Sequence, residues 1–207
     1  MPRATTWERR RYALWAPLYD FVVSPLRAAR KRSIDGLMLT SGERVLLVGA
    51  GTGEDLCFIP EGLFTVASDL TPAMLRRARV KAQVAAHLVV MDGHALGAQS
   101  GTFDAVVLHL ILAVIPDPAQ CLAEAVRVLR PGGRITILDK FVADEHSPSI
   151  GRRLLNLVTS VVATDITRRL DLIIRDSGVP VRRTASAPVF RGLFTIVSLT
   201  AIGGPPS

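Results

Sequence analysis

The sequence predicts an α/β protein whose strands form a doubly wound, mostly parallel sheet. Three observations support this prediction: short apolar runs alternate with helical patterns through the middle of the chain, a glycine-rich loop follows the first run, and an acidic residue ends the second. Strands joined through helices pair in parallel and bind ligands at their carboxyl ends. The length of 207 residues suits one domain with its own hydrophobic core.

Five strands and two helices are predicted in the central part of the chain. The strands are expected at residues 44–48, 64–69, 87–91, 103–109 and 134–139. The first helix begins after the second strand, with Thr71 as its N-cap and Pro72 at its first helical position. The second helix covers residues 117–129, and the Pro-Gly-Gly sequence at 131–133 ends it.

The charges are unevenly distributed along the chain. Residues 1–35 carry eight Arg or Lys against three Asp or Glu, residues 36–149 carry nine against twelve, and residues 150–207 again carry eight against three. Two basic flanks fit an anionic partner, such as nucleic acid or an anionic membrane surface, and they equally fit an arginine-rich solvated surface.

Composition also disfavours several classes of protein. The longest apolar runs are shorter than the roughly 20 residues that a membrane-spanning helix needs, and the N-terminus has no secretion signal. Cys57 and Cys121 have no CxxC motif or His cluster around them, so we expect buried thiols rather than zinc or redox chemistry. We therefore expect a cytoplasmic protein.

The glycine loop is the first chemical signal. Its residues are Gly49, Ala50, Gly51, Thr52 and Gly53, and a helix is expected to start after them. Asp69 follows Gly49 by 20 residues at the end of the next strand, where a carboxylate can accept hydrogen bonds from both ribose hydroxyls of an adenosine. Glu54 and Asp55 would repel a pyrophosphate. The loop therefore favours a cofactor that contains adenosine and no pyrophosphate.

Five segments together resemble the class I S-adenosylmethionine-dependent methyltransferases. They are residues 45–53, 68–75, 91–93, 103–107 and 129–134. The resemblance implies a Rossmann-like seven-stranded sheet with an N-terminal helical lid. It also implies one methyltransferase domain, 1–207, divided into an N-terminal segment (1–35), a cofactor-binding core (36–140), a substrate-side insert (141–165) and a C-terminal helix with strands (166–207).

The resemblance further implies a binding site for S-adenosylmethionine, which leaves as S-adenosylhomocysteine. The glycine loop would hold the methionine moiety and Asp69 the ribose. Residues that would surround the adenine or close over the cofactor are Leu70, Met74, Met91, Asp92, Gly93, His109, Tyr12 and Tyr19. Leu47 departs from the family, because many relatives have Asp or Glu at this position.

Two further segments narrow the resemblance. Residues 11–20 and 112–118 are similar to the soluble type of bacterial phosphatidylethanolamine N-methyltransferases. This similarity implies a phospholipid amine as methyl acceptor. A soluble small molecule or a quinone is the alternative acceptor, and a non-catalytic binding protein with the same fold is a third hypothesis. No N/D-P-P-Y-type tetrad follows the fourth strand, which argues against a nucleic-acid substrate.

The N-terminal aromatic residues suggest contact with a membrane. Trp7, Tyr12, Trp15 and Tyr19 are interleaved with arginines, and Trp, Tyr and Arg favour an anionic membrane surface. We therefore expect peripheral association with the inner face of the cell membrane. Alternatively, the aromatic rings pack as a lid or face a sulfonium or ammonium group.

An amine acceptor must lose a proton, and the sequence offers few candidates for the base. His109, at the end of the fourth strand, has the most suitable side chain, and Tyr19 is the second candidate. Asp139 and Lys140 follow the fifth strand. A structural or cofactor-binding role for His109 is an equal alternative. Paired arginines such as Arg182 and Arg183 could bind a phosphate or simply face solvent.

Overall fold

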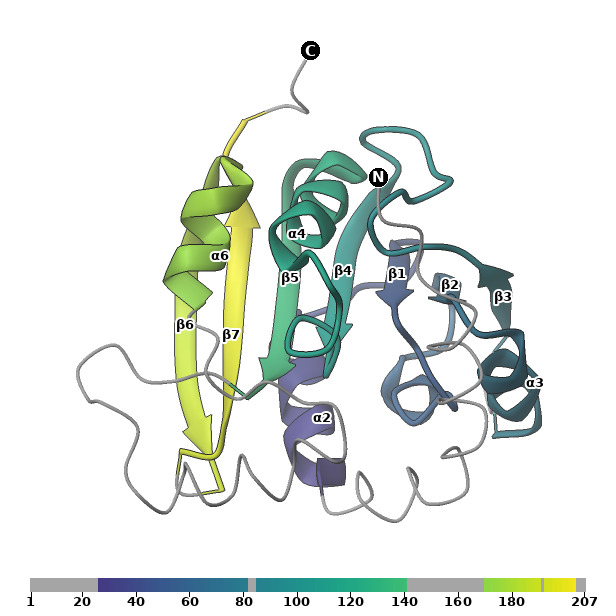
Figure 1. Ribbon diagram of the computed structural model, residues 1–207. Coiled ribbons are helices and arrows are strands. Elements are labelled where there is room, and N and C mark those ends of the chain that lie inside the picture. Colours follow the sequence, from purple (N-terminus) through teal and green to yellow (C-terminus); the bar gives the residue numbers. More distant parts are fainter. Residues whose placement is uncertain (1–25, 82–84, 141–169, 191, 204–207) are drawn as a thin grey trace.

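A seven-stranded sheet forms the centre of the protein (Figure 1). The structure is a computed structural model that describes residues 26–81, 85–140, 170–190 and 192–203. The strand order is β3-β2-β1-β4-β5-β7-β6. The strands are β1 (Arg44–Val48), β2 (Phe64–Asp69), β3 (Ala86–Val90), β4 (Phe103–His109), β5 (Leu129–Asp139), β6 (Val181–Val189) and β7 (Phe194–Ala201).

The pairing of the strands confirms the predicted Rossmann-like, mostly parallel sheet. β1, β2, β3, β4 and β5 pair in parallel, whereas β7 runs antiparallel to both β5 and β6. The chain order reverses between β1 and β4, and ligands of doubly wound sheets bind at such a switch point, outside the carboxyl ends of the strands. Of the expected N-terminal segment 1–35, residues 1–25, which hold Trp7, Tyr12, Trp15 and Tyr19, lie outside the described residues, as does the insert 141–165. The described part of this segment contains helix α2 (Arg27–Asp35).

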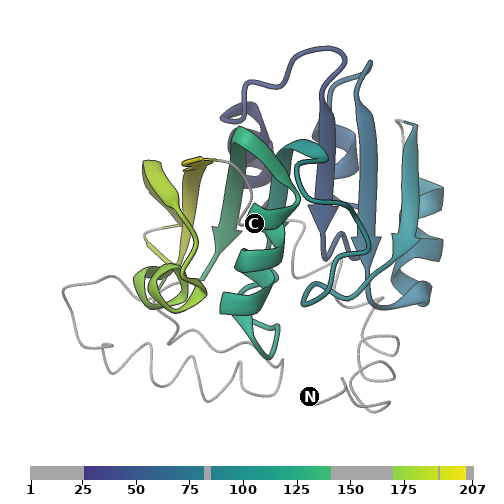
Figure 2. The ribbon, with the colours of Figure 1, turned by 90° about the horizontal axis from the view of Figure 1, so that it is seen from above.

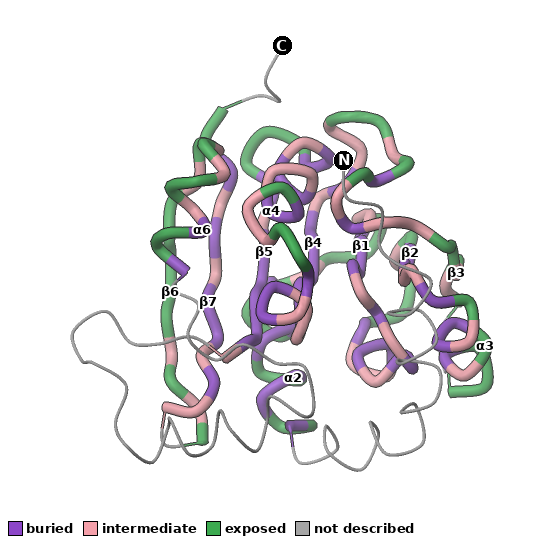
Figure 3. The backbone as a smooth tube through the Cα atoms, viewed as in Figure 1, coloured by how far each residue is buried: buried purple, intermediate pink, exposed green. Residues whose placement is uncertain are grey.

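Helices cover both faces of the sheet, as Figure 2 shows from above. On one face, α4 (Pro118–Arg127) and α6 (Leu170–Ser177) contribute Leu122 and Ile173 to a core cluster with Ile135 and Val106. On the other face, α2 (Arg27–Asp35) and α3 (Pro72–Lys81) contribute to a second cluster. Burial is greatest in the central strands and lower in the edge strands β3 and β6 (Figure 3). No helix of the described segments has the length and apolar character to span a membrane.

Three features differ from the sequence prediction. β3 begins and ends one residue earlier than expected. α4 ends at Arg127, and Leu129 already pairs with Phe103, so the Pro-Gly-Gly sequence lies within β5 rather than before it. No α-helix follows the glycine loop among the described residues, where the short 3-10 helix η2 (Leu56–Phe58) stands instead. In the case of α4, the pairing of Leu129 with Phe103 outweighs the local pattern.

Candidate cofactor and active site

The glycine loop leaves β1 through three residues with left-handed backbone. Gly49, Gly51 and Gly53 have φ values of 69°, 56° and 82°. A Cβ on Gly49 would lie 2.5 Å from Cδ1 of Ile111, and a Cβ on Gly53 would lie 2.9 Å from Cβ of Ala78 in α3. Glycine is therefore required at both positions for conformation and for space. Gly53 serves the packing of the loop on α3, which sequence analysis did not anticipate.

Asp69 lies at the carboxyl end of β2, directly beside the loop. Its Oδ2 accepts a hydrogen bond from the Gly51 N–H at 2.9 Å, and its Oδ1 accepts one from the Thr71 N–H at 2.8 Å. A carboxylate offers about four acceptor sites, so these bonds leave capacity for a ligand hydroxyl. Burial raises the pKa of Asp69, and the hydrogen bonds from Thr71 and Gly51 oppose that shift. Asp69 is half-buried and thus suited to bind a ribose at this edge.

The residues expected around the adenine lie in the next two segments of this edge. The N–H of Met91 donates to the carbonyl of Asp69 at 3.2 Å, so Met91 and Asp69 are adjacent. Gly93 is buried, and a Cβ there would lie 3.4 Å from Cγ1 of Val48. Leu70 is half-buried, whereas the Met74 side chain is buried. Their contacts with adenine stay predictions.

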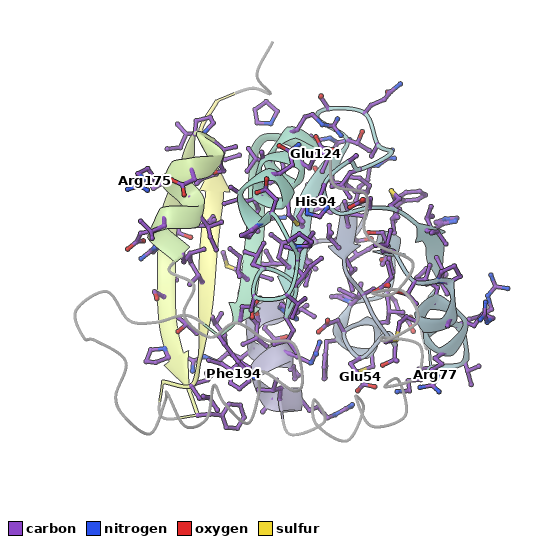
Figure 4. All side chains as sticks on the ribbon, viewed as in Figure 1. Glu54, Arg77, His94, Glu124, Arg175 and Phe194 are labelled. Carbon is purple, nitrogen blue, oxygen red and sulfur yellow. The ribbon has the colours of Figure 1, made fainter. Side chains whose placement is uncertain are left out.

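Asp92 orients a neighbouring histidine. Its Oδ1 accepts from the N–H of His94 at 2.9 Å and lies 2.7 Å from Nδ1 of the same residue. Nε2 of His94 accepts from the N–H of Asp117 at 3.2 Å, at the start of α4, where Figure 4 labels His94. Asp117 itself caps α4 by accepting from the N–H of Gln120 at 2.9 Å. The contacts with His94 therefore fix the Asp92 carboxylate at the edge of the sheet where we expect the adenine.

His109 is 4% exposed, and both of its ring nitrogens have protein partners. Nδ1 lies 2.8 Å from Oδ1 of Asp55, and Nε2 lies 2.9 Å from Oγ of Ser33. Oδ2 of Asp55 accepts from the Arg30 guanidinium at 2.6 Å. Burial alone would raise the pKa of Asp55, but the charges of His109 and Arg30 outweigh burial and hold this pKa well below its usual range. A role of His109 as a base stays a prediction, and this geometry favours a positioning role.

Asp139 ends β5 and is 1% exposed. Its Oδ2 accepts from the N–H of Ala113 at 3.0 Å, and its Oδ1 accepts from the N–H of Lys140 at 2.8 Å. Burial raises the pKa of Asp139 to about 6, against the opposing effect of the backbone hydrogen bonds. Asp139 thereby fixes the loop after β4, in which Leu110 has a left-handed φ of 58°.

Several other predicted residues have defined surroundings. Leu47 is buried in the apolar cluster that also contains Val107 and Ile34, so no acid occupies this part of β1. Arg183 forms an ion pair with Asp171. Tyr12 and Tyr19 lie outside the described residues.

The two cysteines differ in burial. Cys121 is buried as expected, and burial raises the pKa of its thiol to about 12, whereas Cys57 is half-buried.

Sequence analysis missed the partners of His109. The sequence pattern predicts no site role for Arg30 or Ser33, and for Asp55 it predicts only a charge beside the glycine loop. A signal was available in α2, where both polar residues stand next to the buried Ala29 and Ile34 and so share the face that contacts the sheet. Glu54, labelled in Figure 4, instead pairs with Lys81 of α3 at 2.6 Å.

Known proteins resemble this chain over the region of the site. A family model described as a methyltransferase domain matches residues 46–137. The chain is 33% identical over 141 residues to a phosphatidylethanolamine N-methyltransferase of Cereibacter sphaeroides, which covers 66% of this chain and 69% of that protein. It is 32% identical over 135 residues to a demethylmenaquinone methyltransferase of Thermus thermophilus, covering 60% of this chain and 61% of that protein. The chain thus spans less than two thirds of this second relative.

Solved structures share the fold at low sequence identity. A methyltransferase from Aquifex aeolicus aligns with a TM-score of 0.63 at 18% identity, covering 87% of this chain and 93% of that one. The [4+2]-cyclase SpnF aligns with a TM-score of 0.77 at 14% identity and covers 99% of each chain. These likenesses concern the fold alone.

The residues present fit the cofactor that the relatives' names imply. A glycine loop with no room for side chains at Gly49 and Gly53 stands beside a carboxylate with remaining acceptor capacity, at the switch point of the sheet. Together with the similarity to the Cereibacter sphaeroides protein, this assigns both family and cosubstrate. The chain belongs to the class I S-adenosylmethionine-dependent methyltransferases, and S-adenosylmethionine is its methyl donor.

Proposed function

We propose that the methyl acceptor is the amine of an ethanolamine phospholipid. The observation that supports this proposal is the 33% identity to the phosphatidylethanolamine N-methyltransferase over 141 residues. That alignment covers 69% of the relative, more than the alignment with the demethylmenaquinone methyltransferase does. The reaction would be N-methylation of the lipid headgroup.

The N-terminal segment supports a lipid substrate through its composition. Eight basic residues against three acidic ones in residues 1–35 would attract an anionic bilayer, and four Trp or Tyr residues suit the interface. Peripheral binding to the inner face of the cell membrane would bring the enzyme to its acceptor. These features belong to the sequence, because residues 1–25 lie outside the described part of the structure.

Methyl transfer to an amine mainly requires that the methyl donor and the amine are aligned and that water is excluded. S-adenosylmethionine supplies the methyl group in an in-line displacement, which proximity and desolvation accelerate. The acceptor must be a neutral amine, and a dry site itself favours the neutral form of an ammonium group by lowering its pKa. The proton of the ammonium group can then pass to water as the headgroup enters the site, so that deprotonation requires no dedicated base. His109 and Tyr19 remain the candidates if a base takes part.

A quinone precursor is the second candidate acceptor. The demethylmenaquinone methyltransferase of Thermus thermophilus has nearly the same identity to this chain, 32% over 135 residues. A C-methylation of this kind would place an aromatic ring rather than an ammonium group beside the cofactor.

One assay separates the two acceptors. The full chain is incubated with isotope-labelled S-adenosylmethionine and mixed micelles that contain either phosphatidylethanolamine or a demethylmenaquinone. We expect labelled monomethyl lipid and no labelled quinone. Labelled quinone without labelled lipid would overturn the proposal. Asp69→Ala serves as the control, since a reaction that depends on this cofactor site must lose activity with either acceptor.

Membrane association has its own test. The full chain should sediment with anionic vesicles more than with neutral vesicles, and salt should release it, because exposed charges are screened at high ionic strength. Removal of residues 1–11 should reduce sedimentation. Equal binding to both kinds of vesicle would contradict the electrostatic attraction.

A further inference from the structure

A chain of buried polar side chains joins α2 to the carboxyl end of β4. Its members are Arg30 and Ser33 of α2, Asp55 after the glycine loop, His109 of β4 and Thr136 of β5. The contacts are Arg30 to Asp55 at 2.6 Å, Asp55 to His109 at 2.8 Å, His109 to Ser33 at 2.9 Å, and Ser33 to Thr136 at 2.6 Å. We call this set the buried polar network.

The network lies on the sheet face that α2 covers. Leu47, Val107 and Thr136 are register partners in β1, β4 and β5, so their side chains share one face. His109 follows Val107 by two residues and therefore points to the same face. Ile34 of α2 belongs to the same buried apolar cluster as Leu47 and Val107.

The network is tied to the glycine loop through the backbone. The N–H of Gly53 donates to the carbonyl of Ala50 at 2.9 Å, and the N–H of Leu56 donates to the carbonyl of Gly53 at 3.1 Å. The carbonyl of Asp55 accepts from the N–H of Phe58 at 3.0 Å. Fixing the Asp55 carboxylate from α2 and from β4 therefore fixes the turn that begins in the cofactor loop.

Stability alone does not account for such a network. A buried ion pair loses its hydration, and apolar residues of similar size often stabilise a fold equally well or better. The network adds a fixed orientation of its side chains, because hydrogen bonds hold the carboxylate of Asp55 and the imidazole of His109 in place. That property matters where a ligand must be held in a fixed geometry.

We propose that Asp55 and His109 are positioning residues for methyl transfer, holding the glycine loop against β4 so that the methionine end of the cofactor is aligned. His109 acts in this way through Asp55 and not as a proton acceptor. The proposal rests on S-adenosylmethionine as methyl donor and is independent of the acceptor.

The test measures cofactor affinity and stability separately. Asp55→Asn and His109→Gln keep the size of each side chain but weaken the contact between them. Calorimetric titration with S-adenosylhomocysteine should show affinity reduced by about tenfold in each single variant, and the double variant should lose little more than either one, because the two residues act as a unit. Independent, additive losses in the double variant would contradict a shared role.

A matched control separates positioning from general destabilisation. Asp104 accepts from the N–H of Arg44 at 2.8 Å and pairs with Arg130, at the opposite end of β4. Asp104→Asn should lower the urea midpoint without changing cofactor affinity. If it reduces the affinity as much as Asp55→Asn does at equal loss of stability, the network has no specific role and the proposal fails.

Two further measurements keep the proposal testable if the first variants fold poorly. Ser33→Ala removes the contacts of the Ser33 hydroxyl with Nε2 of His109 and with Oγ1 of Thr136, and should weaken cofactor binding about two- to threefold. Unchanged affinity would contradict the proposal. The pH profile of kcat should keep its acidic limb in His109→Gln, with the loss falling on KM for S-adenosylmethionine. Disappearance of that limb, with KM unchanged, would identify His109 as the base and overturn the positioning role.

Discussion

The two halves of the carboxyl edge of the sheet use polar groups in different ways. At the ends of β1 and β2, the half-buried Asp69 accepts hydrogen bonds from the N–H groups of Gly51 and Thr71 and keeps acceptor capacity beside a loop of glycines. At the ends of β4 and β5, His109 and Asp139 are buried and already bound by protein groups. The polar groups of the first half thus have capacity left for a ligand, whereas those of the second half bind neighbouring protein segments.

Two buried carboxylates, Asp55 after the glycine loop and Asp139 at the end of β5, show how the surroundings of a carboxylate set its charge. Asp55 faces His109 and Arg30, and its pKa lies well below the usual range. Asp139 is surrounded mainly by backbone N–H groups, and its pKa rises to about 6. Similar burial thus gives opposite shifts, because charged partners compensate desolvation more fully than neutral donors do.

The largest expected effect concerns the free energy of unfolding. It compares the buried ion pair of Arg30 and Asp55 with the exposed ion pair of Lys31 and Asp35 on the same helix. Arg30→Ala leaves the Asp55 carboxylate buried without its guanidinium, which should lower the free energy of unfolding by about 3 to 5 kcal/mol. Lys31→Ala breaks the exposed pair with Asp35 and should cost about 0.5 kcal/mol or less. Urea unfolding of both variants measures the contrast, and equal losses would show that burial does not set the strength of these pairs.

A second comparison concerns the shape of the glycine loop. Gly53→Ala combines left-handed backbone with a collision against Ala78, and should cost about 3 kcal/mol. Gly101→Ala has a similar φ of 66° and no atom within 4 Å of the new Cβ. It should cost only about 1 to 2 kcal/mol from backbone strain. Thermal and urea unfolding would refute the packing argument if both variants lost the same stability.

A third comparison uses pH to separate the two carboxylates. Because the folded pKa of Asp139, about 6, exceeds the ordinary pKa of an Asp side chain, 3.8, the folded state binds the proton more tightly, and this group's contribution to stability falls as pH rises from 4 to 6. Asp139→Asn removes that dependence. The free energy of unfolding of the wild type minus that of the variant should therefore decrease by about 2 kcal/mol from pH 4.5 to pH 7. A pH-independent difference would contradict the raised pKa.

The sequence predicted the parts of the structure that depend on contiguous residues. The central strands follow from uninterrupted apolar runs, and Asp69 follows from its distance to Gly49. The predicted end of α4, at residue 129, was wrong because Leu129 pairs with Phe103, a partner distant in the chain. The buried polar network could not be found by spacing, since Ser33 and Thr136 are 103 positions apart and meet only in the folded sheet.

Binding of S-adenosylmethionine at the carboxyl ends of β1 and β2 should depend most directly on Asp69. Asp69→Ala removes a charged acceptor whose hydrogen bonds to two ribose hydroxyls are worth about 1.5 to 3 kcal/mol each. Calorimetric titration with S-adenosylmethionine should therefore show affinity at least about tenfold weaker than in the wild type. Asp35→Asn, on the exposed side of α2, should bind the cofactor as the wild type does. Unchanged affinity of folded Asp69→Ala would contradict this assignment of the cofactor site.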